Sequence, residues 1–139
     1  MSLQPTPELK PSMQLFLAFD YGQKRTGVAS GNRITQTAQA LPTVKGEGKL
    51  RWPAIDQLIK EWQPDAIVIG VPYHPDGQPH ENTVLAKKFG RQLYARCGLT
   101  IFEVDERYST VEATAQGAKD PDGGAACIIL EQFLRSIKA

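Results

Sequence analysis

Cysteine is scarce in this sequence, and the spacing of the few cysteines is as informative as their number. The chain has 2 cysteines among 139 residues, Cys97 and Cys127, with neither a CxxC pair nor a Cys/His spacing. This argues against a structural zinc site. Free thiols are typical of proteins in a reducing compartment, so we expect a cytoplasmic protein.

An excess of charge of one sign is also missing. Lysine and arginine total 16 against 15 aspartates and glutamates, which leaves a formal net charge of +1. The electrostatic field of the whole molecule is therefore weak, and any nucleic-acid site has to be a local patch.

Long apolar runs are absent as well. No run reaches the length of a membrane-spanning helix, so no membrane partner is expected. The first residues are polar and contain prolines instead of the apolar centre of a signal peptide. We expect residues 1–13 to form a flexible tail and residues 14–139 to form one domain, because 41% hydrophobic and 22% charged residues is a globular composition.

Apolar patterning predicts strands and helices in a definite order. Strands are expected at 15–19, 26–30, 34–41, 66–71 and 100–104, and helices at 55–62, 81–96, from 109 onward, and at 125–137. The first three strands, joined by short turns, indicate an antiparallel meander. The helix–strand units that follow predict an α/β fold with a mixed five-stranded sheet and helices on both faces.

Acidic residues stand at the ends of several of these elements. Asp20 ends the first strand, Asp105 and Glu106 follow the fifth, and Asp122 precedes the last helix. Sites form at the carboxyl ends of strands in such sheets, and carboxylates are ligands for Mg²⁺ or Mn²⁺ in phosphodiester hydrolysis. Each acid also has a simpler explanation: Asp20 as a turn former, Glu106 as an acid near a helix N-terminus, and Asp122 as an N-cap.

Basic residues near these acids could contact phosphates. The candidates are Lys24, Arg25, Arg107, Lys87, Lys88 and Arg91. Arg107 could equally form a salt bridge with a neighbouring acid. The three on the second helix are typical of a solvated face, although they could extend a nucleic-acid track. His74 and His80 could shuttle protons, but ordinary surface histidines are the commoner case.

Several motifs together carry a family resemblance. They are residues 17–22 (LAFDYG), 24–29 (KRTGVA), 70–72 (GVP), 105–110 (DERYST) and Asp122 ahead of 125–130. In these the chain resembles the YqgF/RuvX family of Holliday-junction resolvases, also described as pre-16S ribosomal RNA nucleases. The resemblance implies a ribonuclease H-like fold of the RuvC branch, with a metal site at Asp20, Glu106 and Asp122. The segment before Asp122 is shorter than the family pattern, so Asp120 is an alternative third acid.

The resulting hypothesis is a nuclease that uses Mg²⁺ or Mn²⁺ to process the 5′ end of precursor 16S rRNA, to cut branched DNA, or both. Two alternatives stay open. One is a non-catalytic RNA-binding or transcription-associated module. The other is an actin-like phosphotransferase, although one domain without a Walker-type glycine loop fits that class poorly. The protein could be a monomer or a homodimer; symmetric cutting of a junction would favour a dimer.

Overall fold

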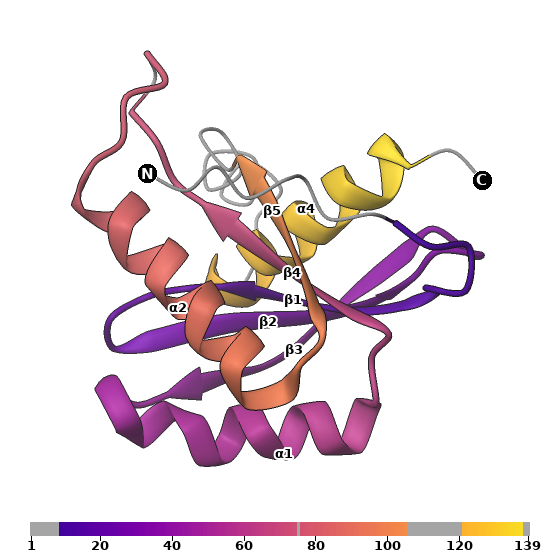
Figure 1. The fold of residues 1–139 in the computed structure, drawn as a ribbon, viewed down its shortest axis with the longest axis horizontal. Helices are drawn as coiled ribbons and strands as arrows, with labels where there is room; N and C mark the ends of the chain where they lie inside the picture. The colour runs from indigo at the N-terminus through magenta and orange to yellow at the C-terminus, as the bar shows by residue number, and fades with distance from the viewer. Residues whose placement is uncertain (1–8, 75, 106–120, 138–139) are drawn as a thin grey trace.

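The computed structural model describes residues 9–74, 76–105 and 121–137, with the backbone alone for 121–123. Its elements follow the predicted order over this part of the chain (Figure 1). They are β1 (Leu15–Asp20), β2 (Arg25–Asn32), β3 (Thr37–Lys45), the 3₁₀ helix η1 (Gly48–Arg51), α1 (Trp52–Trp62), β4 (Ala66–Val71), α2 (Glu81–Cys97), β5 (Thr100–Asp105) and α4 (Pro121–Ser136).

The strands form one mixed sheet in the order β3-β2-β1-β4-β5. β1 pairs antiparallel with β2, and β2 pairs antiparallel with β3, which confirms the predicted meander. β4 is parallel to both β1 and β5. β1 is therefore the central strand, and the carboxyl ends of β1, β4 and β5 lie at the same edge of the sheet.

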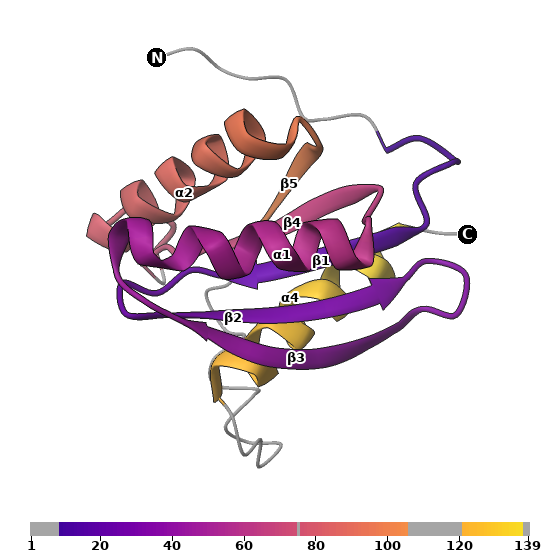
Figure 2. The same cartoon turned by 90° about the horizontal axis from the view of Figure 1, so that it is seen from below.

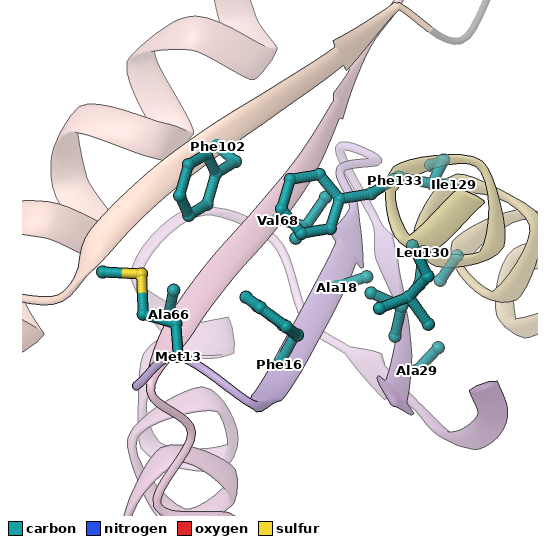
Figure 3. Packing of buried hydrophobic residues seen from close by; sticks show 12 residues of the cluster. Met13, Phe16, Ala18, Ala29, Ala66, Val68, Phe102, Ile129, Leu130 and Phe133 are labelled. Carbon is teal, nitrogen blue, oxygen red and sulfur yellow. The ribbon is translucent and has the colours of Figure 1, made fainter. Parts of the chain in front are cut away.

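One face of the sheet is covered by α4. The side chains that pack there include Phe16, Ala18, Val68 and Phe102 from the strands, with Ile129, Leu130 and Phe133 from the helix (Figure 3). The small residues on this face let the helix approach closely, since a Cβ at Gly31 would lie 2.6 Å from a methyl carbon of Leu130.

The opposite face is covered by α1 and α2, as Figure 2 shows. Its core contains Leu17, Phe19, Ile67 and Ile69 from the strands, packed against Trp52 and Ile55 of α1 and Phe89 and Leu93 of α2. Alternate residues of β1 and β4 thus enter different cores. Both strands are apolar throughout because both of their faces are buried, and the predicted helices on both faces are confirmed.

Several boundaries differ from the predictions; β3, for example, ends at Lys45 instead of residue 41, and α1 begins at Trp52 instead of residue 55. The third strand begins at Thr37 instead of residue 34, because Asn32 caps a turn with its side chain and Gln36 adopts a left-handed conformation with φ 55°. α4 begins at Pro121, so Gly123 and Gly124 are helical where a loop was expected. η1 was not predicted. The helix expected from residue 109 lies outside the described residues. In the described part of the chain, no helix is long and apolar enough to cross a membrane.

Candidate functional site

The carboxyl edge of the three parallel strands brings distant parts of the sequence together. Phe19 of β1 pairs with Ile69 of β4, which in turn pairs with Glu103 of β5. Asp20 and Asp105 therefore end strands that are separated only by β4. The backbones of β1 and β5 are therefore about 10 Å apart, which is two strand spacings. Side chains on the same face of the two strands can come closer than that. The first and fifth strands thus end at the same edge of the sheet.

Strand alternation decides which face each acid occupies. Asp20 has the same parity in β1 as Phe16 and Ala18, which pack under α4. In β5 it is Phe102 that packs under α4, whereas Glu103 bonds to α2 on the other face. Asp105 shares the parity of Glu103, so the register turns it away from the face of Asp20. Asp105 is therefore not a partner of Asp20 in the arrangement we propose below.

The first turn of α4 lies at the same edge as Asp20. The ring of Phe133, near the other end of α4, contacts Phe16 with centroids 5.2 Å apart and Phe102 with centroids 5.0 Å apart. From Phe133 back to Asp122 the helix rises roughly 16 Å, and from Phe16 to Asp20 the strand advances roughly 13 Å. α4 thus runs antiparallel to β1, and both views draw its start toward the end of the sheet at which β1 turns into β2 (Figures 1 and 2).

Not every predicted acid falls within the structure. Glu106 and Asp120, like Arg107, lie outside the described residues, and only the backbone of Asp122 is described. Among residues 9–74, 76–105 and 121–137, no three histidine, cysteine or acidic side chains gather as a metal site. What the structure does bring to one edge is Asp20, half-buried at the end of β1, and the backbone of the turn that carries Asp122.

The turn between β1 and β2 is unusually tight. A Cβ at Gly22 would lie 2.2 Å from the carbonyl oxygen of Arg25, so only glycine fits there without moving the backbone. Lys24 and Arg25 follow in this turn and at the start of β2, and both are exposed. They therefore lie close to the end of β1, and their contact with phosphates stays a prediction.

A buried arginine under this turn was missed by sequence reasoning. Arg51, in η1, is 3% exposed. Its guanidinium donates to the carbonyl oxygens of Gly22 at 3.0 Å and Gln23 at 2.9 Å. It stands in a polar stretch, 45–51, whose lysines and glycines are typical of an exposed loop, and no periodicity marks it as buried.

The basic residues of α2 differ in their partners. Lys87 donates to Glu103 of β5 at 3.1 Å, whereas Lys88 and Arg91 are exposed. Burial lowers the pKa of Lys87, but the hydrogen bond and charge of Glu103, with a smaller contribution from Tyr73, outweigh it and raise the pKa overall. Lys87 therefore differs from Lys88 and Arg91 in having an acidic partner, and a nucleic-acid track along α2 stays a prediction for all three.

The histidines after β4 have a structural explanation. His80 is the N-cap of α2. Its ring Nδ1 accepts from the backbone N–H of Asn82 at 3.1 Å, and its backbone N–H donates to the hydroxyl of Thr83. The rings of His74 and His80 lie 4.7 Å apart. Beside this loop, an open hollow of about 310 Å³ is lined by Val71, Tyr73, Gly77, Glu103, Val104 and Asp105.

Comparison with known proteins identifies the family. Residues 14–136 match the RuvX family, described as a Holliday junction resolvase. The chain belongs to the RuvX family. A Polaromonas sp. (strain JS666) protein, provisionally named a pre-16S rRNA nuclease, is 60% identical over 137 residues, which is 99% of each chain. A similarly named protein of Albidiferax ferrireducens is 53% identical over 154 residues, again 99% of each chain.

The solved structures similar to this RuvX protein show its fold. Thermus thermophilus RuvC in complex with a Holliday junction substrate has a TM-score of 0.58 at 13% identity, covering 88% of this chain and 94% of that one. Another T. thermophilus RuvC structure has a TM-score of 0.52 at 13% identity, covering 88% and 95%. The fold is therefore ribonuclease H-like, as predicted, and the chain is a member of a nuclease family that hydrolyses phosphodiester bonds.

Proposed function

We propose that this RuvX protein is a divalent-metal-dependent endonuclease with Asp20, Glu106 and Asp122 as its ligands. The observation that carries the proposal is the position of Asp20. This acid ends the central strand, on the face that α4 covers, and α4 begins at the same edge. Glu106 directly follows Asp105 in the sequence and is the acid that the family resemblance assigns to the site. Asp120 is the alternative to Asp122.

The chemistry of the donors fits Mg²⁺ or Mn²⁺. All the proposed ligands are carboxylates, which are the hard oxygen donors that both ions take. The nearest softer donor on α4 is Cys127, which packs beside the core under the helix. Burial raises the pKa of the Cys127 thiol, with a contribution from the charge of Glu131, so this group stays protonated and does not compete as a thiolate ligand.

Each residue would then have a defined role. Asp20 would bind the cation and orient it toward the scissile phosphate, with Glu106 and Asp122 completing the ligand set. Lys24 and Arg25, exposed beside Asp20, would hold the flanking phosphates, and Arg107 would offset the charge that develops on phosphate oxygens. The cation, when bound, supplies water activation and charge neutralisation.

The proposed substrate is the precursor of 16S ribosomal RNA, in the cytoplasm. This proposal is based on the names of two relatives, which are 60% and 53% identical to this chain over 99% of its length. Branched DNA is the second candidate, because the family is described as a Holliday junction resolvase. Symmetric cutting of a junction needs two copies, so the mass of the protein in solution bears on this choice.

The direct test is Asp20→Asn, assayed with Mn²⁺ and Mg²⁺ on a precursor 16S rRNA fragment and on a synthetic four-way junction. The variant is nearly isosteric but removes the charge, so we expect cleavage to fall by about a thousandfold or more. Asp56→Asn is the matched control. Asp56 lies on α1 and pairs with Arg96 on the surface, so this change should leave the rate unaltered.

Two results would contradict the proposal. Full activity of Asp20→Asn would remove Asp20 from the site. A wild-type protein that binds the RNA but cuts neither substrate with either metal would favour the non-catalytic alternative. Cleavage of only one substrate, lost on chelation with EDTA, would identify both the substrate class and the dependence on a divalent ion.

A further inference from the structure

Arg51 has a position unlike that of any other basic residue in the described part of the chain. It is 3% exposed, yet it stands in η1, about thirty residues beyond the turn that it contacts. The guanidinium donates to the carbonyl oxygens of Gly22 and Gln23, to the Thr26 hydroxyl at 3.3 Å and to the Gly48 carbonyl at 3.1 Å. Its planar fork therefore joins η1 to both sides of the β1–β2 turn.

Aromatic rings hold the guanidinium in place. Its central carbon lies 4.6 Å from the ring centroid of Tyr21 and 5.9 Å from that of Phe89. Tyr21 directly follows Asp20, and its ring also contacts Phe89 with centroids 5.2 Å apart. Arg51 thus contacts Tyr21, Gly22 and Gln23, which lead from Asp20 to Lys24, and Thr26, which follows Arg25.

Simple packing does not account for an arginine at this position. The acceptors that bond the guanidinium among the described residues are backbone carbonyls and one hydroxyl, and removing a cation from water for such partners is costly. An apolar side chain could fill the space without that cost. What an arginine adds is several donors in a rigid plane, which hold several acceptors in fixed directions at once.

We propose that Arg51 is a positioning residue for the nuclease site. By holding the β1–β2 turn, it keeps the carboxylate of Asp20 in register with the phosphate-binding side chains of Lys24 and Arg25. The proposal rests on the proposed function, because it assigns the turn to both cation binding and phosphate binding. In this proposal Arg51 acts through the turn and binds neither the cation nor a phosphate itself.

The test compares Arg51→Met and Arg51→Lys with wild type and with Lys49→Met. Lys49 is an exposed cation in the same 3₁₀ helix, so its replacement controls for loss of charge in that segment. Misplacing a reacting group by about 1 Å costs roughly a hundredfold in rate, so we expect kcat of Arg51→Met to fall about 10- to 100-fold while KM changes less. Lysine keeps the charge but cannot reproduce the planar fork, so the kcat of Arg51→Lys should lie between those of wild type and Arg51→Met.

Amide hydrogen exchange supplies a readout that does not depend on activity. In Arg51→Met we expect exchange to accelerate in residues 20–26, and at Gly46, whose N–H bonds to the carbonyl of Lys24 at 2.9 Å. The cores under α2 and α4 should keep wild-type protection. The concentration of Mn²⁺ that gives half-maximal rate should rise in parallel, because a mobile Asp20 binds the cation less well.

The outcomes separate the possibilities. A general loss of protection across all strands would overturn the proposal and make Arg51 an ordinary stabilising residue. Local loosening of the turn with kcat within twofold of wild type would also overturn it, because the turn would then not position the chemistry. If the wild-type protein cuts nothing, the proposed function fails. Hydrogen exchange then still tests whether Arg51 holds the β1–β2 turn. Unchanged exchange in Arg51→Met would refute that role, and faster exchange confined to the turn would support it.

Discussion

Replacing Gly22 with alanine tests the geometry of the site through a single methyl group. The added Cβ would lie 2.2 Å from the carbonyl oxygen of Arg25, and ordinary contact begins at 3.4 Å. A backbone oxygen cannot rotate away as the end of a long side chain can, so the turn has to open by about 1 Å. Overpacking of this kind costs roughly 1–3 kcal/mol of stability.

The expected functional effect is larger than the loss of stability alone would explain. A shift of about 1 Å in the turn moves Lys24 and Arg25 relative to Asp20, which should lower kcat roughly a hundredfold. The assay pairs cleavage kinetics with urea denaturation of the same samples. At 25 °C the variant should remain folded, because domains of this size typically have about 5–15 kcal/mol of stability.

Gly98→Ala is the matched control. Gly98 ends α2 with φ +69° and has open space around it, so alanine there costs roughly 1–2 kcal/mol through its left-handed conformation. It precedes β5 and so lies at the edge of the sheet opposite Asp20. The two variants should lose similar stability, but only Gly22→Ala should lose activity. Equal activity in both, or equal loss in both, would refute the reasoning.

Two further predictions concern the core and the thiol under α4. Phe133 is 7% exposed and joins α4 to the sheet, so Phe133→Ala should lower the free energy of unfolding by about 3–5 kcal/mol in urea titrations; a loss under about 1 kcal/mol would contradict the described packing. Burial, with a contribution from Glu131, raises the pKa of Cys127 above its ordinary 9.0. The neutral thiol is therefore favoured in the fold, so stability from this group is present below pH 9 and is lost as the pH rises. Alkylation of Cys127 in the folded protein should reach its half-maximal rate at a pH above 9.0, and a lower midpoint would contradict this assignment.

Sequence patterning identified the elements whose burial is symmetrical or strongly periodic. β1 and β4 are apolar throughout because two cores enclose them, and this leaves a clear signal. β3 is an exposed edge strand with little alternation, so its start was placed three residues too early. There the turn depends on the Asn32 side chain and on a left-handed Gln36, neither of which a hydrophobic pattern encodes.

The site was predictable only in part, for a similar reason. The position of Asp20 follows from its place at the end of a buried strand, and sheet topology explains why the fifth strand ends at the same edge, with β4 between the two strands. Asp105 and Asp20 lie on opposite faces of the sheet, and this could be deduced only once the pairing of β1, β4 and β5 was known. Arg51 could not be found from sequence, because its burial arises from a tertiary contact with a turn on another part of the chain. Asp20, Glu106 and Asp122 all remain predictions as site residues.

The direction of α4 has a practical consequence for experiments. The helix begins beside Asp20 and passes under the sheet, so its last turn, with the exposed Arg135 and Ser136, emerges at the far edge (Figure 2). A fluorophore or surface anchor attached at that end would stand clear of an incoming nucleic acid. Tethering the protein there, instead of through the face that carries Lys24 and Arg25, should leave association with substrate unhindered in surface-based or single-molecule measurements.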